Sequence, residues 1–294
     1  MKRQRRLLGS WRFGLLGVIL AVLPLAGAIG VWSSRVSDSA ILRARALDIT
    51  AGLTSTSARI WAINDWVYHN QGFGKNLQYS IIPALGPTPL QIMQSGGDCS
   101  DKSRLVSAML SEIGIDSGLV MIYPCQHCGP IHTVVEARDA SGYMVVDPVW
   151  DVDYPSGAGR FLGVRELAGT RLGPEHIADL QRQSATGAKI RKMPAAEATF
   201  DYAVAINWDK NFVTRAAAYT LKLLGYAPER ALRPQMLEDP KLALTLFLVA
   251  AAAGLVVLGA AVGFAFPGLA ERFRLPALSQ LRRAQGAKRS VPAQ

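Results

Sequence analysis

The segment between residues 33 and 241 contains no internal repeat and no low-complexity tract, which excludes a solenoid there. Clustered acidic residues are also scarce, and Asp151 and Asp153 alone offer too few oxygen ligands for a calcium-binding loop. Two of the three cysteines form a Cys-x-x-Cys pair, and no second pair completes four zinc ligands. No metal or other cofactor is therefore predicted.

Net charge is absent from the middle of the chain. The formal net charge is +10, yet residues 33–241 contain 21 basic and 21 acidic residues. The excess lies in the two tails, with five basic residues in 1–12 and six basic and one acidic residue in 267–294. The high isoelectric point is therefore no sign of nucleic-acid binding, and no nucleic-acid partner is predicted.

Two runs contain no charged residue at all, and they span residues 13–32 and 242–266. A helix needs about 20 apolar residues to cross a bilayer, so each run is predicted to be a transmembrane helix rather than a buried core helix. A cleaved signal peptide is the alternative for the first run, since Ala26-Gly27-Ala28 offers small residues. The length of that run and Trp32 at its end favour an anchor.

The tail charges predict the topology. Basic residues collect on the cytoplasmic side of membrane proteins, so the tails at 1–12 and 267–294 are expected to be cytoplasmic. Residues 33–241 are then extracytoplasmic. The sequence thus predicts an integral protein of a plasma membrane or bacterial inner membrane, whose tails can also contact anionic lipid of the bilayer.

The outer segment is predicted to be α+β. Amphipathic spacing and glycine stops predict helices at 58–69, 89–93 and 99–113. Alternating apolar residues predict strands at 118–123, 132–138 and 143–149, and Asp139-Ala140-Ser141-Gly142 predicts a hairpin turn between the last two. The pattern is that of a helix packed on an antiparallel sheet.

Cys99 is the first residue of the clearest predicted helix. Unpaired backbone N–H groups and the positive end of the helix dipole lie there, and both stabilise a thiolate. Gly96 and Gly97 allow the backbone to turn tightly just before it. By position alone, Cys99 is either a nucleophile or an inert buried residue.

The predicted hairpin adds two partners. If Arg138 lies opposite Tyr143, then Val134 lies opposite Asp147, and His132 shares a face with Asp147 as its diagonal neighbour. Diagonal neighbours lie roughly 7–8 Å apart at Cα, within reach of their side chains. A carboxylate can then hold the imidazole while the other ring nitrogen faces a nucleophile. The alternatives are a strand histidine and an aspartate that caps a turn.

Three segments combine into a recognisable set, in the order Cys, His and Asp: Thr88-Pro89 with Gly97-Asp98-Cys99-Ser100-Asp101-Lys102 and Leu110–Gly114, then His132-Thr133-Val134-Val135-Glu136, then Tyr143-Met144-Val145-Val146-Asp147-Pro148. Their order and spacing resemble those of the transglutaminase-like superfamily over about residues 58–155. One departure is Thr133, because an aromatic residue is common after the histidine in that family.

The resemblance implies a papain-like core, with the cysteine-bearing helix on an antiparallel sheet, between the two predicted spans. It implies that Cys99, His132 and Asp147 form a catalytic triad for acyl transfer through a thioester, with an amide or ester substrate and water or an amine as acceptor. The Cys99 backbone N–H is a candidate oxyanion donor. Gln78 and Gln91 are the candidate side-chain donors.

Cys125 and Cys128 enclose Gln126-His127 just before the histidine strand. Outside the cytoplasm this spacing favours a disulfide. Two free thiols, or a metal site made of Cys125, His127 and Cys128, are the alternatives.

Two functional classes compete with the acyltransferase. One is a non-catalytic transglutaminase-like scaffold with partners in envelope or polysaccharide assembly. The other is a cysteine peptidase of the same fold. Retention of all three candidate catalytic side chains favours an enzyme that acts on a protein, peptide or other amide substrate outside the cytoplasm.

Overall fold

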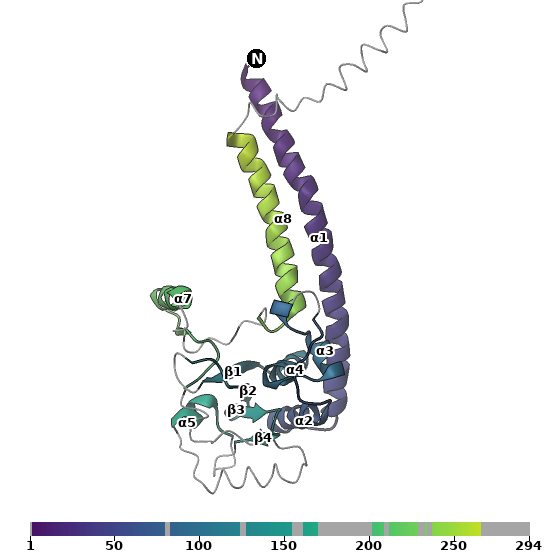
Figure 1. Cartoon of the computed structure of the whole chain (residues 1–294), viewed down its shortest axis with the longest axis vertical. Helices are drawn as coiled ribbons and strands as arrows, with labels where there is room; N and C mark the ends of the chain where they lie inside the picture. The colour runs from purple at the N-terminus through teal and green to yellow at the C-terminus, as the bar shows by residue number, and fades with distance from the viewer. Residues whose placement is uncertain are drawn as a thin grey trace, which may run out of the picture. The chain divides into compact units, whose positions relative to one another are not determined.

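The computed structural model describes residues 2–79, 83–123, 128–154, 161–169, 202–208, 212–228, 233 and 237–265, and it confirms the α+β class. The chain divides into two compact units. One joins residues 1–32 to residues 244–294, and the other comprises residues 33–243 (Figure 1).

Two long apolar helices account for the described part of the first unit. Helix α1 spans Lys2–Ile49 and helix α8 spans Pro240–Ala265. Each contains a stretch long and apolar enough to cross a membrane. The predicted run 13–32 lies within α1, which continues as helix to Ile49, so its last part belongs to the second unit.

These two helices approach closely at a pair of glycines. A Cβ atom on Gly17 would lie 2.7 Å from the carbonyl oxygen of Leu255, and one on Gly259 would lie 2.6 Å from that of Phe13. Only glycine permits this separation of the two backbones. Small residues at such crossings are typical of helix pairs in membranes.

After the end of α1, further helices follow in the second unit. They are α2 (Thr56–His69), the 3₁₀ helix η1 (Pro83–Leu85), α3 (Pro89–Ser95), α4 (Cys99–Glu112), α5 (Val164–Gly169) and α7 (Phe212–Leu223). The three helices predicted at 58–69, 89–93 and 99–113 are confirmed. Side chains cap their starts: Ser55 for α2, Thr88 for α3 and Asp98 for α4.

Five antiparallel strands form one sheet, in the order β4-β3-β2-β1-β5. They are β1 (Ser117–Tyr123), β2 (His132–Asp139), β3 (Gly142–Asp147), β4 (Val152–Asp153) and β5 (Tyr202–Val204). The predicted hairpin register is confirmed, because Arg138 pairs with Tyr143. The short strands β4 and β5 were not predicted.

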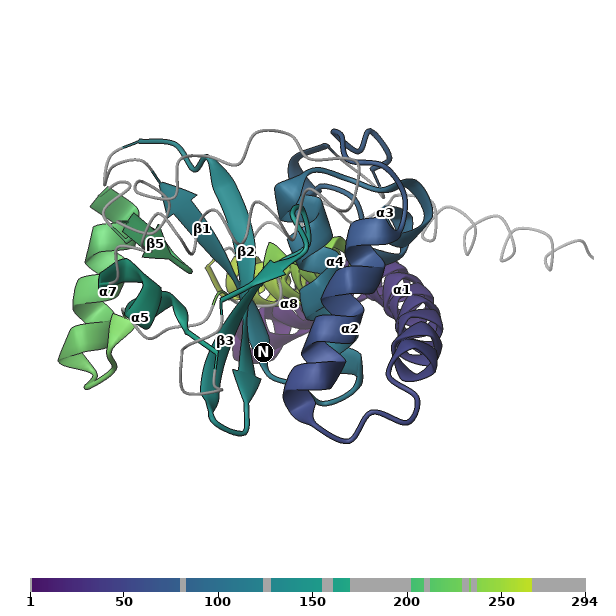
Figure 2. The ribbon, with the colours of Figure 1, turned by 90° about the horizontal axis from the view of Figure 1, so that it is seen from below.

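The two faces of the sheet have separate cores. Helices α2 and α4 pack on one face, where Val135 and Val146 join the apolar residues of the helices (Figure 2). Val134 and Val145 point to the other face, where they pack with Trp150 and the residues around α5. Residues of alternate parity in β2 and β3 thus face opposite sides, as a pleated sheet requires.

Candidate active site

Asp98 fixes the start of α4, where Cys99 is the first helical residue. Its Oδ1 accepts hydrogen bonds from the backbone N–H groups of Ser100 at 3.0 Å and Asp101 at 3.1 Å. The Asp101 carboxylate accepts from the Asp98 N–H at 3.3 Å, which completes a capping box. Cys99 is the first residue of α4, and the N–H groups of a first helical turn have no acceptor within the helix, so the Cys99 N–H can donate to a substrate oxygen.

Gly96 and Gly97 are required by the crowding around this turn. Gly96 has a φ of +77°, and a Cβ there would lie 2.4 Å from the carbonyl oxygen of Gly72. A Cβ on Gly97 would lie 2.2 Å from the Cβ of Asp101. The two glycines therefore let the chain enter α4 directly beside the segment that follows α2, as their positions in the sequence predicted.

Lys102 attaches α4 to the end of α2. Its side chain is buried, and its Nζ donates to the carbonyl oxygens of Val67 at 2.7 Å, Tyr68 at 3.0 Å and Asn70 at 3.3 Å. These carbonyls belong to the C-terminal end of α2, where helical partners run out and a positive charge is favourable. One ammonium group thus positions the cysteine-bearing helix against its neighbour.

His132 and Asp147 meet where β2 begins and β3 ends. His132 Nε2 lies 2.6 Å from Asp147 Oδ2, and the side chains are 4% and 0% exposed. The other oxygen, Asp147 Oδ1, accepts from the Val149 N–H at 2.8 Å. Because both carboxylate oxygens are engaged, the imidazole is held in one orientation.

The Cys99 side chain is a hydrogen-bonding neighbour of His132. Burial by itself lowers the pKa of His132, but the charge of Asp147 and its hydrogen bond, with smaller contributions from Cys99, outweigh burial and raise that pKa to about 10. Since Nε2 faces Asp147, Nδ1 is the ring nitrogen left for the thiol. The structure therefore brings all three predicted site residues together.

Trp150 covers the imidazole. The ring centroids of His132 and Trp150 lie 4.2 Å apart with an interplanar angle of 38°, and Trp150 is 8% exposed. A buried indole in this position excludes water from the His132–Asp147 pair and interacts favourably with an imidazolium.

Asn64 of α2 links that helix to the end of β3, which carries Asp147. Asn64 of α2 is fully buried, and its Nδ2 donates to Asp151 Oδ1 at 3.0 Å and lies 3.4 Å from the carbonyl oxygen of Asp147. Sequence analysis missed this link, because Asn64 lies in an amphipathic helix far from the three motifs. A buried polar residue on the apolar face of that helix was the available signal.

Asp65, His69 and Asp151 form a cluster next to this link. One potential ligand atom from each residue lies within 4.8 Å of the others. Among the described residues, this group has the composition and spacing of a possible cation site. Burial first, and then the charge of Asp65 and a hydrogen bond to it, raise the pKa of Asp151 to about 6. His69 Nδ1 lies 3.3 Å from Asp65 Oδ1. Asp151 therefore keeps its proton to a higher pH than an ordinary aspartate.

The remaining predicted candidates have different outcomes. Cys128 is disulfide-bonded and Cys99 is a free thiol, while Cys125 and His127 lie outside the described residues. Gln91 uses its side-chain oxygen to accept from the Thr88 N–H at 2.8 Å within the cap of α3. Gln78 is exposed. The identity of an oxyanion side chain stays a prediction.

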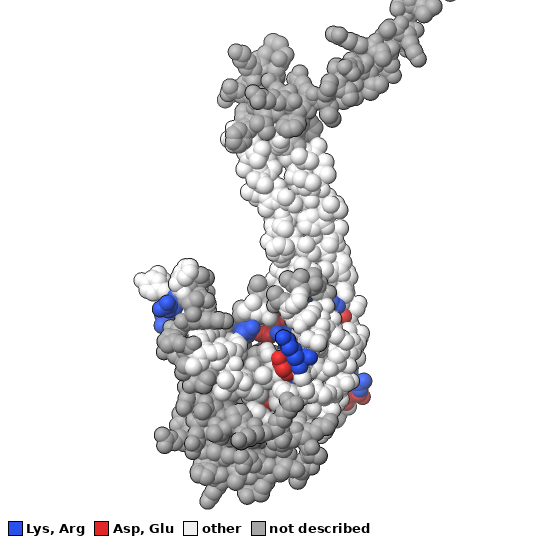
Figure 3. Space-filling view, in the orientation of Figure 1, with Lys and Arg blue, Asp and Glu red and all other residues white. Residues whose placement is uncertain are grey.

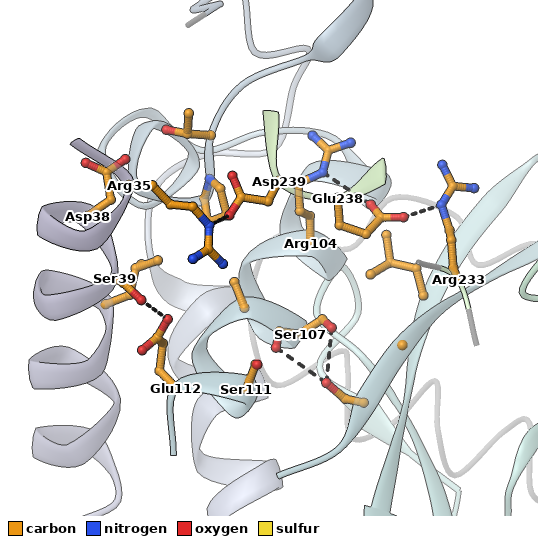
Figure 4. Close-up of a pocket in the computed structure, with 17 residues that line it drawn as sticks. Arg35, Asp38, Ser39, Arg104, Ser107, Ser111, Glu112, Arg233, Glu238 and Asp239 are labelled. Carbon is orange, nitrogen blue, oxygen red and sulfur yellow. Dashed lines mark hydrogen bonds and ion pairs between the residues drawn. The ribbon is translucent and has the colours of Figure 1, made fainter. Parts of the chain in front are cut away.

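A polar cavity lies elsewhere in the second unit, between α1, α4 and the residues just before α8 (Figure 4). Glu238 pairs with Arg104 and Arg233, and Asp239 pairs with Arg35 at 2.6 Å. The cavity measures about 80 Å³, well below the ~300 Å³ at which small-molecule sites begin. These ion pairs therefore serve to join the helices.

Residues 43–148 match the transglutaminase-like superfamily, so the chain carries a transglutaminase-like domain that includes all three site residues. No curated protein matches the chain in sequence. A crystal structure from Cytophaga hutchinsonii, described as a putative cysteine protease, is similar with 20% identity and a TM-score of 0.33. That match covers 39% of this chain and 38% of the other, so the chain spans little more than a third of that structure's length.

Proposed function

We propose that the transglutaminase-like domain at residues 43–148 is a thiol acyl-transfer enzyme, with Cys99 as nucleophile, His132 as acid and base, and Asp147 as the residue that orients His132. The observation that carries the proposal is the contact chain from a free thiol at a helix start, through a buried imidazole, to a buried carboxylate. Inert cysteines have no need of this arrangement.

The reaction proceeds in two halves. The Cys99 thiolate attacks the carbonyl carbon of an amide or ester, and the N–H of Cys99 is placed to donate to the oxyanion. The C–N or C–O bond breaks as His132 gives its proton to the leaving amine or alcohol, which leaves a thioester. Water or an amine then attacks the thioester, His132 takes up its proton, and Cys99 departs as the thiolate. A water acceptor makes the enzyme an amidase or peptidase, and an amine acceptor makes it a transamidase.

The decisive experiment measures alkylation of Cys99 at pH 6 by iodoacetamide, with the full chain in nanodiscs and quantification by mass spectrometry. A free thiol with a pKa of about 8.5 is only about 0.3% thiolate at that pH. We expect Cys99 to react at least tenfold faster than in the denatured chain, His132→Gln to abolish this advantage, and His69→Gln on the exposed face of α2 to retain it. Equal rates in the folded and denatured chains would instead support the non-catalytic scaffold.

We further propose that two spans, in α1 and α8, anchor the domain to the membrane. Their length and composition support this, and the basic tails at 1–12 and 267–294 favour cytoplasmic ends with residues 33–241 outside. Reporter fusions at Gly157 and Ser290 test the orientation. For a reporter that is active only outside the cytoplasm, activity at Ser290 together with inactivity at Gly157 would contradict this orientation.

A further inference from the structure

Helix α7 leaves an apolar stripe uncovered. Phe212, Tyr219 and Leu223 are 78%, 65% and 69% exposed, and Ala216 lies between them. At 100° per residue these four positions fall on one side of the helix. The partly buried residues, in contrast, are Thr214, Ala218 and Leu221 on the opposite side. The helix therefore packs by one face and presents a continuous apolar face outward.

The charged residues within 212–228 are all basic. Arg215 and Lys222 flank the stripe, and residues 212–228 contain no acidic residue. Figure 3 shows basic atoms and no acidic atoms on the visible side of α7. Beyond the helix, Leu224 and Tyr226 are 67% and 66% exposed and extend the apolar surface. In Figure 2, α7 lies beyond β5, at the edge of the sheet.

We infer that α7 docks on a bilayer that contains anionic lipid, with its stripe at the level of the lipid headgroups. Amphipathic helices of this composition lie in the membrane interface, where aromatic rings sit at headgroup level and basic side chains reach the phosphates. Within residues 212–228, the basic side chains and the lack of acidic ones complement a surface that carries negative lipid headgroups. A membrane is the occupant that the rest of the chain also supplies, through its two span-length apolar helices.

The inference rests on the proposed membrane anchoring and is independent of the proposed chemistry at Cys99. Docking of α7, which follows β5 in the chain, gives the domain a contact with the membrane in addition to the two proposed spans in α1 and α8. It confines the substrates of the domain to those found at the membrane surface, such as membrane-tethered peptides or proteins.

The test places an environment-sensitive dye on either of two neighbouring exposed residues. Ala216→Cys puts the dye in the stripe, and Ala217→Cys puts it on the same helix about 100° away. Both variants carry Cys99→Ser and are studied as the full chain in nanodiscs. The nanodiscs contain phosphatidylcholine with a shallow nitroxide lipid, either alone or with one part in four of phosphatidylglycerol.

We expect the nitroxide to quench the dye at residue 216 more than at residue 217, and more strongly when phosphatidylglycerol is present. Replacing both Arg215 and Lys222 by Gln should weaken docking by about thirtyfold at low salt, as two screened charges at an anionic surface predict. Equal quenching at the two positions overturns the proposal. So does a dye response that depends on protein concentration and ignores lipid, because it indicates a second copy of the chain on the stripe.

Failure of this inference is separable from failure of the proposed enzyme. Iodoacetamide reactivity of Cys99 at pH 6 is measured on the chain with wild-type α7, and it reports the site whether or not α7 touches lipid. The reporter fusions likewise test the anchoring alone.

Discussion

The ring of Trp150 lies over the ring of His132, at a centroid separation of 4.2 Å. The same imidazole is bonded through Nε2 to Asp147, so its cationic form is stabilised by a carboxylate at one edge and an indole on one face. Neither neighbour is interchangeable with an apolar side chain, because each one interacts with the charge itself.

Trp150→Leu is expected to slow Cys99 alkylation at pH 6 by about fivefold, which corresponds to the loss of roughly 1 kcal/mol of cation–π interaction. Trp150→Phe keeps an aromatic face and should retain most of the wild-type rate. The pH profile of alkylation distinguishes the two variants. Identical profiles for Leu and Phe would mean that Trp150 only fills space.

Asp147→Asn should reduce turnover of an activated ester far more than it reduces Cys99 alkylation. The amide can still accept from the Val149 N–H, but it no longer supplies the charge that raises the pKa of His132. Loss of the corresponding aspartate costs about 10⁴ in the rate of serine-protease triads, which sets the scale. Asp139→Asn in the exposed hairpin turn is the matched control, and an equal effect of both substitutions would contradict the assigned role.

The domain is expected to lose stability when Lys102 is replaced by Met. The substitution keeps the apolar stem but leaves three carbonyl oxygens at the end of α2 without the ammonium donor. Hydrogen bonds that involve a charged group contribute about 1.5–3 kcal/mol, so we expect an unfolding free energy lower by about 3 kcal/mol. Differential scanning fluorimetry of the full chain measures this, and Lys75→Met at an exposed position should leave the melting temperature unchanged.

Asp151→Asn should stabilise the folded state above pH 6 and not at strongly acidic pH. The pKa of Asp151 is about 6 in the folded protein, against an ordinary value of 3.8. Between these two pH values, Asp151 is protonated in the folded protein and ionised in the unfolded chain. Stability therefore falls as pH rises from 3.8 to 6, and the penalty is complete above 6. Since Asp151 is only partly buried, solvent screening limits the gain to about 1 kcal/mol.

The left-handed backbone of Asp151, with a φ of +54°, does not oppose that substitution, because Asn adopts this conformation readily. Melting temperatures at pH 8 and pH 4 provide the measurement. Asp116→Asn, at an exposed position, is the control. A gain that is the same at both pH values would show that the raised pKa of Asp151 has no part in it.

Local signals predicted the turn, the helix start and the hairpin on which the candidate site is built. The Gly96-Gly97 turn, the capped start of α4 and the Asp139–Gly142 hairpin are all set by neighbouring residues, and the hairpin register then determines which face His132 and Asp147 share. Strand β5 escaped prediction because it is only three residues long and is defined by its pairing with β1, about 80 residues earlier.

The support behind the site escaped prediction for the same reason. Asn64 meets Asp151 across 87 residues, and Trp150 finds His132 only through the turn after β3. The extension of α1 beyond residue 32 contains many polar residues, so no simple apolar run marks it in the sequence. Leu42 and Ala46 of that extension are buried in the helical core, which explains why it stays helical.

His132 and Asp147 are 15 residues apart on one hairpin, whereas Cys99 arrives on a separate helix. Hairpins of this kind form in about 1–10 μs, but docking of a helix on a sheet waits for non-local contacts. During folding, the Cys99 thiol therefore meets His132 only after helix and sheet have assembled. A chain that crosses a membrane unfolded would carry an ordinary cysteine, and the acyl-transfer activity that we propose would appear only with the finished fold.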